Sequence, residues 1–201
     1  MVVYGMPIAL DMLHRFSDDE IEQLSRRNPN YAFERLPEGE LLVSPPLGWQ
    51  GGRDELRLGW RLAAWSDRAG GGGEAFGPST GFTLPDGALL SPDAAWLDAE
   101  RYAELQEKQP LNKFAPVCPT IAFEIVSSSD LLSVLRRKIE SYVRNGASRA
   151  ILIDPERRLI EVSGKDALHV PTADPANVII PLEALPGATE PLHLDLSELF
   201  S

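Results

Sequence analysis

The stretch from Ile121 to Asp154, IAFEIVSSSDLLSVLRRKIESYVRNGASRAILID, decides the fold. Its first segment, 120–126, is apolar apart from Glu124 and predicts a central strand covered on both faces. The segment 130–145 carries apolar residues at helical spacing, and the apolar segment 149–154 predicts a second strand. A strand–helix–strand unit of this kind, placed among hairpins, predicts an α/β (α+β) fold with a mixed central sheet flanked by helices.

Lys138 is the charged residue that this pattern places on the buried stripe of the helix. At 100° per residue it falls among Leu135 and Ile139, while the other charges of the helix fall on the opposite face. A buried ammonium is unfavourable unless carboxylates or a reacting group neutralise it. The best acidic partners in the sequence are Glu124 and Asp93.

Hairpins and further helices are expected around this unit. We predict a helix over 17–28, a hairpin over 31–36 and 40–44, a helix over 53–68, an antiparallel meander over 74–77, 81–84 and 89–97 whose last strand carries Asp93, a helix over 98–108, a hairpin over 149–154 and 159–163, and short edge strands beyond 164. There is no βαβα alternation of the dinucleotide-binding type.

The helix over 53–68 has apolar residues that the periodicity groups on one side, namely Leu56, Trp60, Ala63 and Ala64. We expect this side to face the core. A core position is also expected for the rings of Trp60 and Trp65, with an interface in a homodimer as the alternative.

The composition indicates one domain over 1–201, with the helix 17–28 and the tail 164–201 as additions to it. The single cysteine excludes an internal disulfide, and neither a signal peptide nor a membrane-spanning run is present, so we expect a cytoplasmic protein without a membrane partner. The formal charge of −11 weighs against a protein that simply coats DNA.

Two carboxylates on neighbouring strands, Asp93 and Glu124, suit a hard cation such as Mg²⁺ or Mn²⁺. A lysine beside them, Lys138, suits the stabilisation of phosphoryl charge or the orientation of water. Each residue also has a purely structural explanation: Asp93 begins a strand, Glu124 pairs with an arginine, and Lys138 extends to the surface. If all of these explanations hold, the central strand must accommodate the charge of Glu124 and the apolar stripe of the helix must accommodate the charge of Lys138.

A run of motifs in order resembles the Uma-type family, a family of predicted restriction endonucleases in the PD-(D/E)xK nuclease superfamily. The motifs are TGFTLPDG (80–87), SPDAAW (91–96) and FEIVSSSD (123–130), followed by Lys138, Tyr142, Asn145-Gly146 and Ile153-Asp154-Pro155. The resemblance spans roughly residues 31–162, and it implies a restriction-endonuclease-like core.

The resemblance also implies site roles. Asp93 and Glu124 would be metal ligands and Lys138 the catalytic lysine, supplied from the helix because Val126 stands where the commoner form of the superfamily has its lysine. For a fourth acidic residue, Glu34 is preferred over Glu55.

The resulting hypothesis is a Mg²⁺- or Mn²⁺-dependent endonuclease that hydrolyses DNA with metal-activated water. Two alternatives stay open: a binding or assembly module that keeps the fold without turnover, and a nuclease acting on RNA or on structured nucleic acid. The sequence contains no module that would decide between DNA and RNA.

Overall fold

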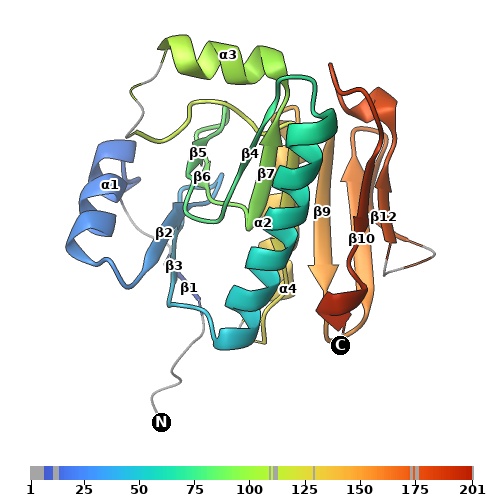
Figure 1. Ribbon diagram of the computed structural model, residues 1–201. Helices are drawn as coiled ribbons and strands as arrows, with labels where there is room; N and C mark the ends of the chain where they lie inside the picture. Colours follow the sequence, from blue (N-terminus) through green and yellow to red (C-terminus); the bar gives the residue numbers. More distant parts are fainter. Residues whose placement is uncertain are drawn as a thin grey trace.

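The computed structural model of the protein describes residues 7–10, 14–108, 110, 113–128, 130–172, 174 and 177–200 (Figure 1). Residue 129, within the motif 123–130, therefore lies outside the described residues. The helices are α1 (Asp18–Arg27), α2 (Trp49–Ala69), α3 (Ala99–Lys108) and α4 (Leu132–Arg144), with short 3₁₀ turns η1 (Leu182–Ala184) and η2 (Ser197–Phe200). In the described part, no helix is both long and apolar enough to cross a membrane.

The strands are β1 (Ile8–Leu10), β2 (Ala32–Arg35), β3 (Leu41–Ser44), β4 (Glu74–Phe76), β5 (Phe82–Thr83), β6 (Leu89–Leu90), β7 (Ala94–Leu97), β8 (Ile121–Ile125), β9 (Arg149–Asp154), β10 (Leu159–Gly164), β11 (Ala167–Pro171), β12 (Asn177–Ile180) and β13 (Leu192–Asp195). They form a six-stranded sheet in the order β11-β10-β9-β8-β7-β4, a five-stranded sheet in the order β1-β3-β2-β6-β5, and the separate pair β12-β13.

The six-stranded sheet is mixed, as the sequence predicts. Strands β8 and β9 run parallel, with Glu124 opposite Leu152, and the other neighbours are antiparallel. The parallel pair is the one joined by α4, which follows from the crossover that parallel strands require. All five residues of β8 are buried, so the prediction of a central strand covered on both faces is confirmed.

The two faces of this sheet are covered by different elements. Ile121 and Phe123 of β8 pack with α2 and the C-terminal segment, whereas Ala122 packs with α4 and with residues of the five-stranded sheet. Alternation along the strand then directs Glu124 to the α4 side. In Figure 1, α2 lies in front of the sheet and α4 behind it.

The predicted meander is wrong in its pairing. Strand β4 pairs directly with β7 in the larger sheet, while β5 and β6 form a hairpin in the smaller sheet. The expected long strand 89–97 is split into β6 and β7 at residues 91–93, where Pro92 has no N–H to donate to a sheet. Asp93 therefore precedes β7, and its N–H donates to the Phe123 carbonyl at 2.9 Å.

The predicted core face of α2 is also wrong. Leu56 and Trp60 are 74% and 66% exposed, and Leu58, Leu62 and Trp65 are buried instead. The helix carries apolar residues on both sides, so periodicity alone does not decide which side packs inward. Trp65 occupies the expected core position and Trp60 does not.

The C-terminal segment contributes to the main core. β11 forms an edge of the larger sheet as expected, but β12 and β13 pair with each other. Val178, Ile180, Leu192 and Leu194 of this pair pack against the cluster that holds α2 to the sheet. Trp65 Nε1 also donates to the Pro191 carbonyl at 3.1 Å.

We expect Leu194→Ala to lower the free energy of unfolding by about 2–5 kcal/mol, because it leaves a cavity beneath α2. His193→Ala, at the neighbouring exposed position of β13, should change stability by less than about 0.5 kcal/mol. Urea unfolding of both variants measures the difference. Equal stability of the two variants would show that the C-terminal pair is not part of the core.

Candidate active site

Four elements bring the predicted site residues together. Glu34 lies on β2, Asp93 lies directly before β7, Glu124 lies on β8 and Lys138 lies on α4. Glu124 and Lys138 are 2% and 3% exposed, and Glu34 is buried as well. The convergence expected from the sequence is therefore present, with two sheets and one helix contributing to it.

The Lys138 ammonium lies between two carboxylates. Its Nζ is 2.8 Å from Glu34 Oε1 and 2.9 Å from Glu124 Oε2, and it donates a longer bond of 3.5 Å to the Ser91 carbonyl. Burial by itself would lower the Lys138 pKa, but the charges of Glu124, Glu34 and Asp93 outweigh burial and raise the pKa above its ordinary value. Lys138 is thus held as a cation and does not extend to solvent.

Glu124 is held at both of its oxygens. Oε2 accepts from Lys138, and Oε1 accepts from the Tyr142 hydroxyl at 2.9 Å. Burial raises the pKa of Glu124 well above its ordinary value, the neighbouring acids Asp93 and Glu34 raise it further, and Lys138 opposes the shift. Pairing with an arginine, the structural alternative for Glu124, is not what the structure contains.

Asp93 and Glu55 form a second contact in the cluster. Asp93 Oδ2 accepts from the Ile125 N–H at 2.6 Å, and the Asp93 and Glu55 side chains are hydrogen-bonded to each other. Burial raises the pKa of Asp93 to about 6, although Lys138 opposes this. Burial, with the nearby charge of Asp93, raises the pKa of Glu55 to about 8. Burial and neighbouring negative charge thus make both carboxyl groups harder to ionise than an exposed carboxyl group.

Two contributors were not given these roles by the sequence. Tyr142 was expected as one of the family's motif residues and was given no role. It lies four residues after Lys138, which puts its hydroxyl on the same face of the helix. Glu55 was the second choice for a fourth acid. Glu34 and Glu55 both join the cluster, Glu34 at Lys138 and Glu55 at Asp93.

Carboxylate oxygens, the ligand type that hard divalent cations prefer, are the acidic groups of the cluster. Among the described residues, the cluster brings four carboxyl groups, of Glu34, Glu55, Asp93 and Glu124, to one ammonium, that of Lys138. The raised pKa values of Glu55, Asp93 and Glu124 reflect burial first and the neighbouring negative charge second. Within that part of the chain, no three His, Cys, Asp or Glu side chains enclose a metal position by themselves. Mg²⁺ commonly takes only one or two carboxylates and completes its shell with water and phosphate.

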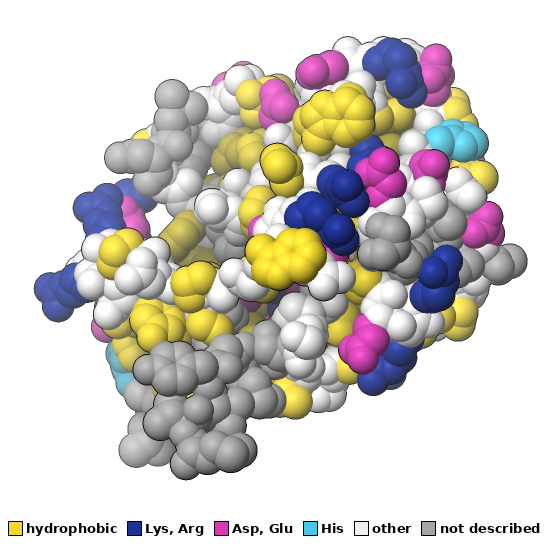
Figure 2. Space-filling model, turned by 60° about the horizontal axis from the view of Figure 1, so that its bottom comes forward, with side chains coloured by type: hydrophobic (Ala, Val, Ile, Leu, Met, Phe, Trp, Pro, Cys, Tyr) yellow, Lys and Arg dark blue, Asp and Glu magenta, His cyan; other side chains and the backbone are white. Residues whose placement is uncertain are grey.

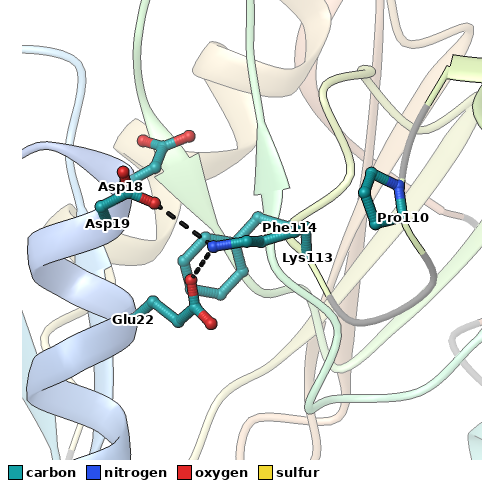
Figure 3. Close-up of a pocket in the computed structure, with 6 residues that line it drawn as sticks. All are labelled: Asp18, Asp19, Glu22, Pro110, Lys113 and Phe114. Carbon is teal, nitrogen blue, oxygen red and sulfur yellow. Dashed lines mark hydrogen bonds and ion pairs between the residues drawn. The ribbon is translucent and has the colours of Figure 1, made fainter.

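A separate surface pocket lies between α1 and the residues Pro110, Lys113 and Phe114 (Figure 3). It has a volume of about 300 Å³ and is lined by Asp18, Asp19, Glu22, Pro110, Lys113 and Phe114. The Lys113 ammonium pairs with Glu22 at 2.6 Å and with Asp19 at 3.3 Å. No residue of the Lys138 cluster lines it.

The family model described as "Uma2: Putative restriction endonuclease" matches residues 18–197. The chain belongs to this family. This match confirms the resemblance that the sequence motifs indicate. No curated protein matches the chain.

A solved structure shares the fold of this chain. It is described as a "putative nuclease belonging to DUF820 from Anabaena variabilis ATCC 29413", and it superposes with a TM-score of 0.70 at 18% sequence identity. The match covers 92% of this chain and 97% of that one. At this identity the likeness supports the fold, which is the mixed α and β architecture described above.

We expect Lys138→Met to lower the free energy of unfolding by about 3–5 kcal/mol at neutral pH, because buried carboxylates lose their cation. Removal of Lys138 raises the folded-state pKa of Glu124 further. In the variant, protonated Glu124 is compatible with burial at low pH, and this contribution to stability is lost as the pH rises through the raised pKa of Glu124. The loss in free energy of unfolding caused by Lys138→Met should therefore be smaller at pH 5 than at neutral pH.

The matched control is Arg137→Met, which removes a surface cation paired with Glu38 and Glu40. It should cost less than about 1 kcal/mol at either pH. Urea unfolding with a chelator present measures both variants. A Lys138→Met deficit that is the same at pH 5 and pH 8 would contradict the assigned charge pairing.

Proposed function

We propose that the protein is a metal-dependent endonuclease that hydrolyses phosphodiester bonds of DNA, acting in the cytoplasm. The observation that carries the proposal is the buried Lys138 ammonium beside Asp93 and Glu124, in a chain of the Uma2 family. A buried cation of this kind costs stability relative to an apolar core, so its retention is best explained by chemistry.

Asp93 and Glu124 are the proposed ligands of Mg²⁺ or Mn²⁺. When bound, such an ion acts as a Lewis acid toward phosphate and lowers the pKa of a water molecule. Lys138 is the proposed catalytic lysine, whose ammonium neutralises charge that develops on the phosphate. Glu34 and Tyr142 act as positioning residues, because they hold Lys138 and Glu124 respectively.

One observation favours the second candidate, a binding module without turnover. Both carboxylate oxygens of Glu124 already accept hydrogen bonds, from Lys138 and from Tyr142. If Glu124 is a metal ligand, the ion must bind an oxygen that already accepts a hydrogen bond, or one of the two hydrogen bonds must break. Metal binding without cleavage would identify this candidate.

Cleavage of supercoiled plasmid by the purified protein, with Mg²⁺ or Mn²⁺ and with a chelator control, tests the proposal. We expect nicked or linear product that depends on the metal. Asp93→Asn should lower the rate at least about a hundredfold, in line with the loss of several kcal/mol of metal-based stabilisation.

Asp19→Asn is the matched control, since this exposed carboxylate lies in the separate surface pocket. It should leave the rate unchanged. Cleavage of single-stranded RNA in preference to plasmid would reassign the substrate. Absence of cleavage of every substrate with either metal would remove the enzyme claim, and calorimetric titration with Mn²⁺ would then show whether a binding function remains.

A further inference from the structure

The outward face of α2 is unusually apolar for a solvent-exposed helix. Trp49, Leu56 and Trp60 are 80%, 74% and 66% exposed. Their spacing of seven and four residues places them on one stripe of the helix. The face that comes forward in Figure 2 shows large hydrophobic side chains next to Lys and Arg side chains. Single exposed apolar residues are ordinary, but a row of this size marks a contact surface.

Small residues lie on the same stripe, beside the large ones. Gly52, Gly59 and Ala63 fall within about 60° of Leu56 around the helix axis, at 100° per residue. A Cβ added at Gly52 or at Gly59 would meet nothing within 4 Å. Each glycine inside a helix costs about 1 kcal/mol relative to alanine. Packing within the described chain therefore gives no reason for glycine at these positions.

We infer that this face of α2 docks against the same face of a second copy of the chain, with the two helices antiparallel about a two-fold axis at Leu56. In that arrangement Leu56 meets the partner's Leu56. Trp60 lies level with the partner's Gly52, and Trp49 lies level with the partner's Ala63, so large side chains meet small ones. A parallel arrangement would instead set each tryptophan against its own copy. Self-complementarity of this kind is what a two-fold interface requires.

The exposed area is sufficient for most of such an interface. The rings of Trp49 and Trp60 present roughly 300–400 Å² at their observed exposure. Leu56, which is 74% exposed, adds to this area. A stable interface buries about 800 Å² on each partner, and the arginine stems beside the stripe supply further surface.

The charges beside the stripe are partly balanced within the chain, where Arg53 pairs with Asp54 at 2.9 Å. Arg57 and Arg61 pair with Glu198 at 3.4 Å and 3.1 Å. The guanidinium groups of Arg53 and Arg61 lie 5.8 Å and 5.9 Å from the ring centres of Trp49 and Trp60. These pairs reduce the like-charge repulsion between two such faces. The same pairs leave little free positive charge for a nucleic-acid strand, in a chain of net charge −11.

The proposed dimer has a consequence that rests on the proposed function. A two-fold axis perpendicular to both helices keeps the same flank of each helix on the same side of the pair. Glu55, on one flank of α2, is hydrogen-bonded to Asp93. Both candidate active sites would therefore lie on the same side of the dimer, one for each strand of a duplex.

The mass of the purified full-length chain, measured by light scattering without nucleic acid or added metal, tests the interface. We expect twice the mass of one chain. Leu56→Lys and Leu56→Glu should each raise the dissociation constant at least about thirtyfold, because like charges meet at the axis. An equimolar mixture of the two variants should restore the dimer, since Lys then meets Glu. Ile179→Lys, at a 58% exposed site on β12, is the control and should remain dimeric.

A second variant separates the interface from the fold. Gly52→Gln has open space within the chain and a better helix propensity, so it should raise the unfolding midpoint of the chain while weakening the dimer. A monomeric wild type would overturn the inference, as would a dimer indifferent to both Leu56 variants. Quenching of Trp49 and Trp60 fluorescence by an oligonucleotide in a monomeric chain would assign the face to nucleic acid instead. Because the readout is mass, failure of plasmid cleavage does not affect this test.

Discussion

The buried ammonium of Lys138 is the constraint on which the rest of the structure depends. Its two carboxylate partners come from different sheets, Glu34 from the five-stranded sheet and Glu124 from the six-stranded sheet. The third oxygen, of Ser91, belongs to the segment that joins the sheets. One cation therefore fixes α4 against both sheets, and any shift of the helix would leave buried carboxylates unpaired. An apolar core would achieve the same packing at lower cost, which is why the cluster indicates function.

The sequence predicted the part of the fold that contains this cluster. Strands β8 and β9 and helix α4 could be predicted because the spacing of their apolar residues is clear. The position of Lys138 between Leu135 and Ile139 on the buried side follows from helical geometry. The hairpin β2–β3 was predicted for the same reason, because its turn and alternation are local. The convergence of Asp93, Glu124, Lys138 and Glu34 was then inferred from charge balance and from the family motifs.

What the sequence did not predict depends on contacts between distant segments. Strands of two or three residues, such as β4, β5 and β6, carry too little pattern to identify their partners. In α2, Leu56 and Trp60 form as regular a stripe as Leu58, Leu62 and Trp65, and only packing decides between them. The role of Glu55 follows from that decision, because the orientation of α2 brings its side chain to Asp93. The tail 164–201 looked peripheral, yet its strands complete the core beneath α2.

Helix α2 thus connects the candidate site to the outside of the molecule. Its inner face packs on the sheet, one flank contributes Glu55 to the acidic cluster, and its outer face carries the exposed tryptophans. The same helix would link metal chemistry to assembly, because a change in its position would act on Asp93 and on the outer face together.

Diffraction at the manganese edge, from crystals of the protein grown with Mn²⁺, tests the central claim most directly. We expect anomalous density in contact with carboxylate oxygens of both Asp93 and Glu124, with Lys138 still paired to Glu34. Density absent from this position, with Glu124 held only by Lys138 and Tyr142 at saturating Mn²⁺, would contradict it.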